Sequence, residues 1–181
     1  VTVQDVEVNL SDGMSMSQLT PVSGDFLFAN LPLGQDYSVT PYSNVRPVNG
    51  VSTFDLVLIN KHILGLAPLN SPYKMIAADV NNSSSITTLD LIQLRKLILS
   101  INTELPNNTS WRFVPASFQF PDPSNPFATE FPEILNYNDL QSAIASGDFV
   151  AIKIGDVNEN AVPNSNVASG RTIAGVFNLN V

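Results

Sequence analysis

Two stretches of the chain repeat each other and decide its helical part: VSTFDLVLINKHILGL at residues 51–66 and ITTLDLIQLRKLILSI at residues 86–101. The copies are offset by 35 residues, so that Asp55 matches Asp90. Apolar residues recur every three or four positions in both copies, which is the period of one helix face. A Ser or Thr pair near the start of each copy can cap the first helical turn. The repeat therefore predicts two equivalent helices.

A twelve-residue loop, DVNNSSSITTLD, leads into the second copy and ends at its acidic residue. Oxygen-bearing side chains fall at loop positions 1, 3, 5, 7, 9 and 12, which is the ligand spacing of an EF-hand calcium loop. The candidate ligands are Asp79, Asn81, Ser83, Ser85, Thr87 and Asp90. Ser84 replaces the usual Gly at position 6, and position 12 is Asp rather than Glu. We expect one Ca²⁺ here, with a polar turn before an N-capped helix as the alternative.

The first copy lacks such a loop. Counting back from Asp55 puts Arg46 and Val48 at loop positions 3 and 5, and neither side chain can ligate calcium. A second candidate segment, GDVNEN at residues 155–160, begins like a calcium loop but has no carboxylate at its twelfth position. We hypothesise that the two incomplete halves form one split site for a second Ca²⁺. Its ligands would be Asp55, Ser52, Asp156 and Asn158.

The two loop–helix units, residues 44–101, resemble the type I dockerin repeat of cellulosomes and its relatives in secreted bacterial surface proteins. The resemblance implies two calcium loops, each followed by a helix, and a cohesin-like binding partner. We accordingly assign residues 43–160 to a dockerin-like calcium-binding domain in which residues 102–154 are an insertion. An Asn-, Ser- and Pro-containing linker follows at residues 161–170.

The insertion is too long for a structureless loop, so we expect it to pack on the two helices. Its Pro-spaced aromatic residues, between Trp111 and Phe131, suit core packing, with a carbohydrate site as the alternative. Residues 138–144 favour a short helix, and residues 149–154 favour a strand.

Residues 1–42 favour short β-strands separated by turns. Val6, Val8 and Leu10 alternate with polar residues, and Phe26 and Phe28 lie two positions apart. The stretches DVEVNL (5–10), GDFLFANLPLG (24–34) and YSVTP (37–41) resemble the prealbumin-like sandwich of Cna protein B-type and carboxypeptidase regulatory-like domains. The resemblance implies a stalk or spacer. The predicted fold class is thus mixed α and β, a prealbumin-like β-sandwich followed by a dockerin-like pair of calcium loop–helix units.

Residues 171–181 read as an apolar strand beyond the linker. The resemblance implies a further strand just before DVEVNL, and we expect the chain to start too late to supply all of it. An incomplete sheet edge invites an added strand. We expect residues 171–181 to complete a neighbouring copy or repeat; folding back on their own domain, or opening a further domain, are the alternatives. The residues of this strand-donation interface are Thr172, Ile173, Val176, Phe177, Leu179 and Val181.

Composition narrows the function classes. The chain has 181 residues and a net charge of −8, so a phosphate-binding surface, and with it a nucleic-acid partner, is not expected. There is no Cys, which excludes disulfides and thiol catalysis. No apolar run is long enough to span a membrane. Charged residues make up 13 %, against about 25 % in average soluble domains, and neutral polar residues replace them, which favours an extracellular protein.

No catalytic constellation is evident. His62 is the one His and falls at a helical position that Leu97 occupies in the other copy, which favours a structural role. Nothing in the sequence fixes Glu130 opposite Glu133, as glycoside hydrolysis would need. We predict a non-enzymatic structural subunit, extracellular or on a bacterial cell surface. It would assemble with copies of itself into a filament or stalk by C-terminal strand donation and be stabilised by calcium; the alternative is a dockerin-type module that anchors to a cohesin-like partner.

Overall fold

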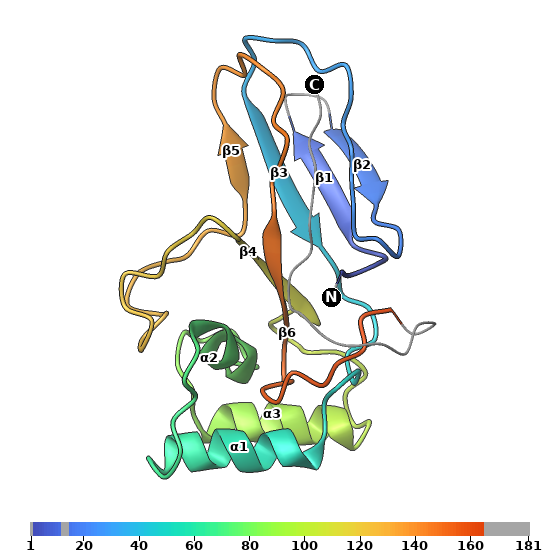
Figure 1. The fold of residues 1–181 in the computed structure, drawn as a ribbon. Helices are drawn as coiled ribbons and strands as arrows, with labels where there is room; N and C mark the ends of the chain where they lie inside the picture. Colours follow the sequence, from blue (N-terminus) through green and yellow to red (C-terminus); the bar gives the residue numbers. More distant parts are fainter. Residues whose placement is uncertain (1, 12–14, 165–181) are drawn as a thin grey trace.

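The computed structural model describes residues 2–11 and 15–164 (Figure 1). It is a mixed α and β fold with antiparallel sheets and three helices, so this coarse part of the predicted fold class is confirmed. The elements are β1 (Glu7–Ser11), β2 (Ser15–Leu19), β3 (Tyr37–Tyr42), α1 (Thr53–Ile63), α2 (Pro72–Ala78), α3 (Thr88–Ile98), β4 (Trp111–Pro115), β5 (Leu135–Tyr137) and β6 (Phe149–Lys153). The predicted strand-donating residues, 171–181, lie outside the described part of the chain.

The larger sheet has the strand order β2-β1-β3-β5, and all its neighbouring strands are antiparallel. Val6, Val8 and Leu10 are fully buried, as their alternation predicts. Phe26 and Phe28 are also buried, and their ring centroids lie 5.6 Å apart. Their segment does not join the sheet as a strand, however; the Leu27 amide donates to the Gln18 side chain of β2 at 3.0 Å.

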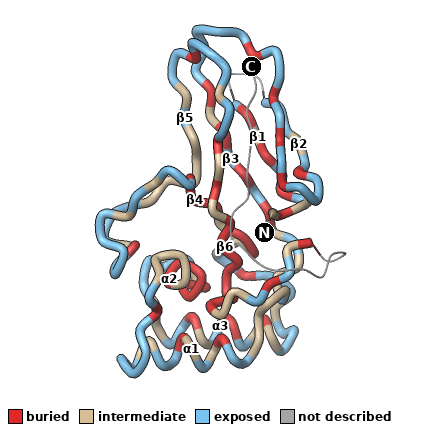
Figure 2. The backbone as a smooth tube through the Cα atoms, in the orientation of Figure 1, coloured by how far each residue is buried: buried red, intermediate tan, exposed pale blue. Residues whose placement is uncertain are grey.

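A two-stranded ribbon of β4 and β6 lies between this sheet and the helices (Figures 1 and 2). Trp111, Phe113, Phe149 and Ala151 of the ribbon join the core under the sheet. The alternate residues Val114 and Ile152, and Ile154 just beyond β6, join the core under the helices. Because both of its faces are buried, the ribbon connects the two cores, and both of its strands come from residues 102–154.

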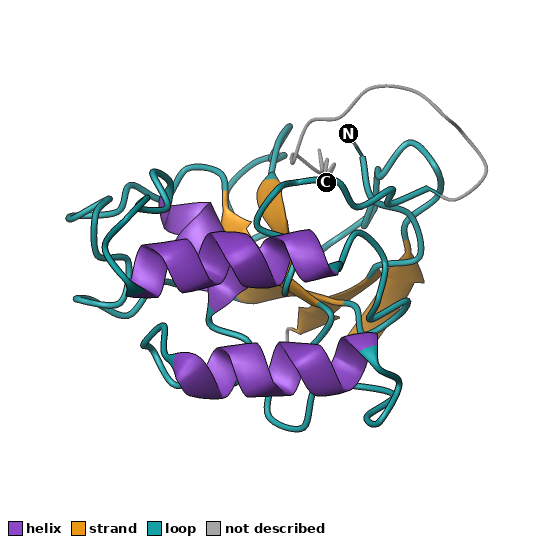
Figure 3. Ribbon diagram, turned by 90° about the horizontal axis from the view of Figure 1, so that it is seen from below, coloured by secondary structure: helices purple, strands orange, loops and turns teal. Residues whose placement is uncertain are grey.

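The helices α1 and α3 occupy equivalent positions in the two sequence copies and pack against each other (Figure 3). They run in opposite directions, so their N-termini lie at opposite ends of the pair (Figure 1). Ser52 and Thr87 cap them, and each cap is a capping box completed by the Asp three residues later. The pair buries Ile59 of α1 and Leu94 and Leu97 of α3.

One local prediction was wrong. Residues 138–144 form no helix, because Asp139 has φ +50° and the Leu140 amide donates to the Gln35 carbonyl at 2.9 Å. The Leu140 carbonyl in turn accepts from the Gly34 amide at 2.8 Å. This pairing with the turn before β3 takes the backbone groups that a helix would need.

Candidate calcium sites

The contiguous loop, residues 79–90, links the end of α2 to the start of α3. Asp79 is the C-cap of α2, and Asp90 is the third residue of α3. Both side chains are fully buried. The Asp79 carboxylate accepts the amides of Ser83 and Ser84, each at 2.8 Å. Asp90 accepts the amides of Asn81, at 3.1 Å, and Thr87, at 2.8 Å. These bonds wrap the loop around its two carboxylates.

The loop holds one oxygen without a partner. Asn81 Oδ1 is buried and accepts no hydrogen bond from any described residue. Leaving such an atom buried and unpaired costs about 1–3 kcal/mol, so native structures usually give it a partner. Asn81 occupies position 3, where a calcium loop supplies a side-chain oxygen.

The electrostatics of the loop also favour a cation. Burial raises the pKa of Asp79, and the negative charge of Asp90 raises it further, although the Ser83 and Ser84 amides and Arg112 act in the opposite direction. Two buried carboxylates so close together repel each other unless a positive charge lies between them. A calcium ion would supply that charge.

The other four predicted ligands, all neutral residues, are also in this loop. Ser83 Oγ lies 3.1 Å from Ser85 Oγ, at positions 5 and 7. Thr87 Oγ1 accepts the Leu89 amide and donates to Asp90, so its side chain already caps α3. Ser84, at the position that Gly usually occupies, has φ +59°. This left-handed conformation explains the usual Gly and makes Ser84 a strained substitute.

The split arrangement brings together all four residues of the hypothesised second site. Asp55, three residues after Ser52 and fully buried, accepts the amides of Val157 at 3.1 Å and Asn158 at 3.2 Å. Its other oxygen accepts the Ser52 amide and hydroxyl, each at 2.9 Å. The Asp156 carboxylate, 5 % exposed, accepts the amides of Asn160 and Ala161.

The main contacts of the two arrangements correspond. Asp156 takes the place of Asp79 and Asn158 that of Asn81, whereas Asp55 and Ser52 take the places of Asp90 and Thr87. Asn158 Oδ1 is likewise buried and without a hydrogen-bond partner. Among the described residues, only four buried side-chain nitrogen or oxygen atoms lack a partner, and two of them are these equivalent asparagine oxygens.

Three residues that a contiguous first loop would use, Asn44, Arg46 and Val48, take no part in either site. Asn44 Oδ1 accepts the Ser110 amide at 2.8 Å, and Arg46 pairs with Asp5 at 3.0 Å. Val48 is half-exposed. The place that a contiguous first loop would fill is therefore occupied by residues 156–161, which come about a hundred residues later in the chain.

Neither site is a cluster of charged ligands. The described residues contain no group of three or more His, Cys, Asp and Glu side chains that could hold a metal ion. Each arrangement instead has two carboxylates and several neutral oxygens, a donor set that suits Ca²⁺ and not the softer metals. His62 is used in a local hydrogen bond, in which its Nδ1 accepts the Leu69 amide at 3.1 Å.

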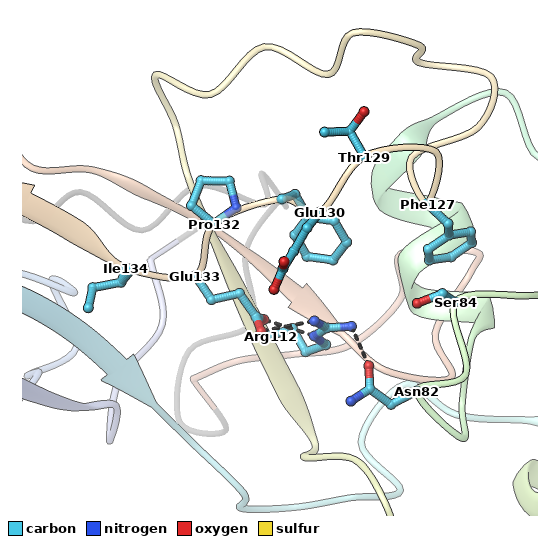
Figure 4. A pocket seen from close by; sticks show the side chains of 10 residues that line it. Asn82, Ser84, Arg112, Phe127, Thr129, Glu130, Pro132, Glu133 and Ile134 are labelled. Atoms are coloured by element: carbon cyan, nitrogen blue, oxygen red, sulfur yellow. Dashed lines mark hydrogen bonds and ion pairs between the residues drawn. The ribbon is translucent and has the colours of Figure 1, made fainter.

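A polar cavity of about 830 Å³ adjoins the contiguous loop (Figure 4). Asn82 and Ser84 of the loop line it, together with Arg112 of β4 and residues of the segment that leads to β5. The Arg112 guanidinium binds Glu133 through two nitrogens, at 2.8 and 2.9 Å, and donates to Asn82 Oδ1 at 2.8 Å. Sequence reasoning missed Arg112, because nothing in the sequence signals that β4 passes beside the loop.

No model of a protein family, no curated protein and no solved structure matches this chain. None of the helices in residues 2–11 and 15–164 is long and apolar enough to cross a membrane.

Proposed function

We propose that this protein is a non-enzymatic, calcium-binding structural module of an extracellular or bacterial cell-surface assembly. Two Ca²⁺ ions would bind, one in the contiguous loop and one in the split site. In this proposal the four-stranded sheet belongs to a prealbumin-like sandwich, and the two helices with their loops are a dockerin-like pair. The metal would stabilise the fold by binding only the folded chain.

One observation carries the calcium proposal. Asn81 Oδ1 and Asn158 Oδ1 are equivalent, buried and unpartnered, and each lies beside a pair of buried aspartates. A purely structural polar turn would be expected to satisfy such oxygens. Direct coordination to a cation supplies both the missing partner and the missing positive charge.

Isothermal titration with calcium tests the proposal. We expect two ions to bind per chain, and the Asp79→Ala and Asp156→Ala variants each to lose one. Asp122→Ala is a matched control, since Asp122 is an exposed aspartate that accepts the Ser124 amide in another loop. Absence of binding to the unmodified protein, or equal stoichiometry in all variants, would contradict the proposal.

Self-assembly by strand donation remains part of the proposal, although its donor residues lie outside the described chain. Its support among the described residues is the edge strand β2, which pairs on one side only, with β1. Unpaired backbone groups at a sheet edge can accept a strand from another chain. Electron microscopy with calcium should show filaments that disappear when residues 171–181 are deleted. A chain that stays monomeric with these residues present would contradict this part.

The alternative, a module that anchors to a cohesin-like partner, is favoured by a specific surface. Helices α1 and α3, and the residues just after each of them, expose large apolar side chains at equivalent positions. The matched pairs are Phe54 with Leu89, Val57 with Ile92, Leu64 with Leu99 and Leu66 with Ile101. Each pair is exposed to a similar degree, for example 57 % and 59 % for the first. Apolar side chains left in water at this density are typical of a docking surface.

The charge on this surface indicates the partner's chemistry. Lys61 lies between Val57 and Leu64 on the outer face of α1, and Lys96 has the same place on α3. A partner with an apolar centre and acidic flanks would complement either helix. Binding to a panel of recombinant cohesin domains should survive Lys61→Glu or Lys96→Glu alone and fail in the double variant. Unchanged binding in the double variant, or no binding to any cohesin, would contradict the anchoring function.

A further inference from the structure

The cavity beside the contiguous loop has the size and the walls of a ligand site. Its volume of about 830 Å³ falls within the usual range of small-molecule sites, about 300–1,000 Å³. One wall is the loop, through Asn82 and Ser84, and another is the segment from Phe127 to Ile134 (Figure 4). The calcium proposal does not use the side chains that face this cavity.

The charges of the lining exclude an anion as the preferred ligand. Arg112 is the one cationic residue in the lining, and its guanidinium is already bound at two nitrogens by Glu133. No hydrogen bond or ion pair links Glu130 to another described residue, and its carboxylate points toward the Arg112–Glu133 pair (Figure 4). The lining therefore has a net charge of −1, with one carboxylate available to accept hydrogen bonds.

A cationic ligand is disfavoured for a different reason. The guanidinium carbon of Arg112 lies 4.8 Å from the centre of the Phe131 ring, so this aromatic face already has a cation over it. A second cation would be placed close to the first. The remaining lining offers neutral hydrogen-bonding groups from Asn82, Ser84 and Thr129, and the half-buried ring of Phe127.

Neutral polar groups, a free carboxylate and an aromatic ring are the combination that a saccharide requires. Its hydroxyl groups donate to carboxylate and amide oxygens, and its C–H face packs on an aromatic ring. The loop wall is preorganised, because Asn82 and Ser84 have φ +56° and +59° and the Ser84 amide is held by Asp79. Binding would therefore cost little ordering of the protein.

We propose that this cavity binds a saccharide unit, with Glu130, Thr129 and Asn82 contacting its hydroxyl groups and Phe127 packing on its ring. The proposal does not depend on the cohesin-like partner or on strand donation. It gives the segment between β4 and β5 a binding role in addition to its part in packing against the helices.

Saturation-transfer NMR on the full chain in calcium-containing buffer tests this site. The probes are the methyl glycosides of glucose, galactose, mannose, N-acetylglucosamine and N-acetylgalactosamine, followed by a printed glycan array. Phe127→Ala should weaken binding of the responding sugar about tenfold or more, and Glu130→Gln about threefold or more. Tyr42→Ala on β3 and Glu7→Gln on β1 are the matched controls and should bind as the unmodified protein does.

Three results would overturn the proposal. The first is no response from any glycoside or array glycan, and the second is binding that both cavity variants leave unchanged. The third is a cavity that responds only to a cationic probe, methylammonium, or only to an anionic one, acetate. A proton spectrum with dispersed methyl signals establishes that each variant is folded, so loss of binding in Phe127→Ala is not confused with unfolding.

Discussion

The contiguous loop and the split site reach the same local geometry by different routes. In the first, residues 79–90 supply every group, so the loop only has to turn back on its own helix. In the second, Asp55 of α1 holds the amides of Val157 and Asn158, which lie just over a hundred residues away in sequence. A metal at the first site would order a loop, whereas a metal at the second would tie the end of the described chain to the first helix.

The contacts around the split site are consistent with its connecting the end of the described chain to the first helix. Gly50 has φ +76°, and a Cβ at this position would lie 2.4 Å from the Ala161 nitrogen, so only Gly allows the two segments to approach. Beyond them, Asn164 accepts the Gln4 amide at 2.9 Å and donates to the Thr2 carbonyl at 3.0 Å. The chain thus runs from the helices back to the start of the β-sheet region through the split site.

Removing calcium should have the largest effect on both sites. A ligand at a hundred times its Kd stabilises the folded state by about 2.7 kcal/mol per site. We expect a chelator to lower the free energy of unfolding by about 5 kcal/mol if both sites bind comparably, as measured by urea denaturation. Magnesium should restore little of this, since it binds such flexible all-protein sites poorly. An unfolding curve that chelation leaves in place would contradict calcium-dependent stability.

The variants Asp79→Ala and Asp156→Ala should distinguish the contiguous site from the split site. Each removes one carboxylate ligand, so its site should lose the ion, at a cost of about 2.7 kcal/mol when calcium is present at a hundred times its Kd. Only Asp156→Ala should loosen the connection to the β-sheet region, because its loop leads to Asn164. Hydrogen exchange at the Gln4 amide should therefore accelerate in Asp156→Ala and stay slow in Asp79→Ala. Equal exchange in the two variants would argue against a tie.

A buried lysine distinguishes the split site from its counterpart. Lys153 precedes Asp156 by three residues, and Ile76 has the equivalent place before Asp79. Burial lowers the pKa of Lys153 to about 7, although nearby Asp156 acts to raise it, and the Nζ donates to the carbonyls of Pro47 and Ile154 at 2.7 and 3.2 Å.

This shift predicts a pH dependence of stability. Between pH 7 and the ordinary lysine pKa of 10.5, the unfolded chain binds a proton that the folded chain has released. The free energy of unfolding in saturating calcium should therefore rise with pH, by up to about 1.4 kcal/mol per unit between pH 7.5 and 9.5. Lys153→Met should abolish the rise. A flat profile for the unmodified protein, or the same slope in Lys153→Met, would show that the residue is not buried in this way.

Variants of Asn81 and Asn158 show whether these asparagines are calcium ligands or have only a structural role. Asn81→Ala and Asn158→Ala each remove an oxygen that has no partner in the protein, so neither should destabilise the calcium-free chain. In calcium each should cost about 1–2 kcal/mol, since a ligand is lost. Asn82→Ala is the matched control at the contiguous site, because the Asn82 side chain accepts from Arg112 and is not one of the predicted ligands. Equal losses with and without calcium would mean that the asparagines have a structural role instead.

The smallest change in stability is expected from a backbone difference between the contiguous loop and residues 156–161. Ser84 has φ +59°, whereas Ala161 at the equivalent place is not among the residues with positive φ. Ser84→Gly should stabilise the protein by about 0.5–1 kcal/mol in thermal unfolding, since Gly adopts this conformation without strain. Ala161→Gly should give no such gain. Stabilisation by Ala161→Gly and not by Ser84→Gly would reverse the comparison.

The repeat was readable from sequence because each copy carries its own signals. Helix α1 spans 53–63 and α3 spans 88–98, which preserves the offset of 35, and both predicted caps are present. These features are local, so sequence spacing alone identifies them. The split pairing of Asp55 with Asp156 and Asn158 was a hypothesis, made because residues 155–160 begin like a calcium loop; its two halves lie just over a hundred residues apart, so no local spacing fixes their pairing.

The strand predicted at residues 149–154 is confirmed as β6, whereas the elements that were missed have weaker or mixed signals. Strand β4 is buried on both faces, so Phe113 and Val114 enter different cores and no alternation results. Helix α2 is only seven residues long and has no side-chain cap, and β5 has three residues. The cavity depends on Arg112 and Glu133, whose pairing follows from the path of the ribbon and not from their spacing.

We propose that the contiguous and split arrangements are two equivalent calcium sites. An anomalous difference map from a crystal grown in calcium would reveal them. The account predicts two peaks per chain, one about 2.3–2.6 Å from oxygens of Asp79, Asn81 and Asp90, and the other at the same distance from oxygens of Asp156, Asn158 and Asp55. A single peak in the contiguous loop would contradict the equivalence, and a map with neither peak would contradict calcium binding altogether.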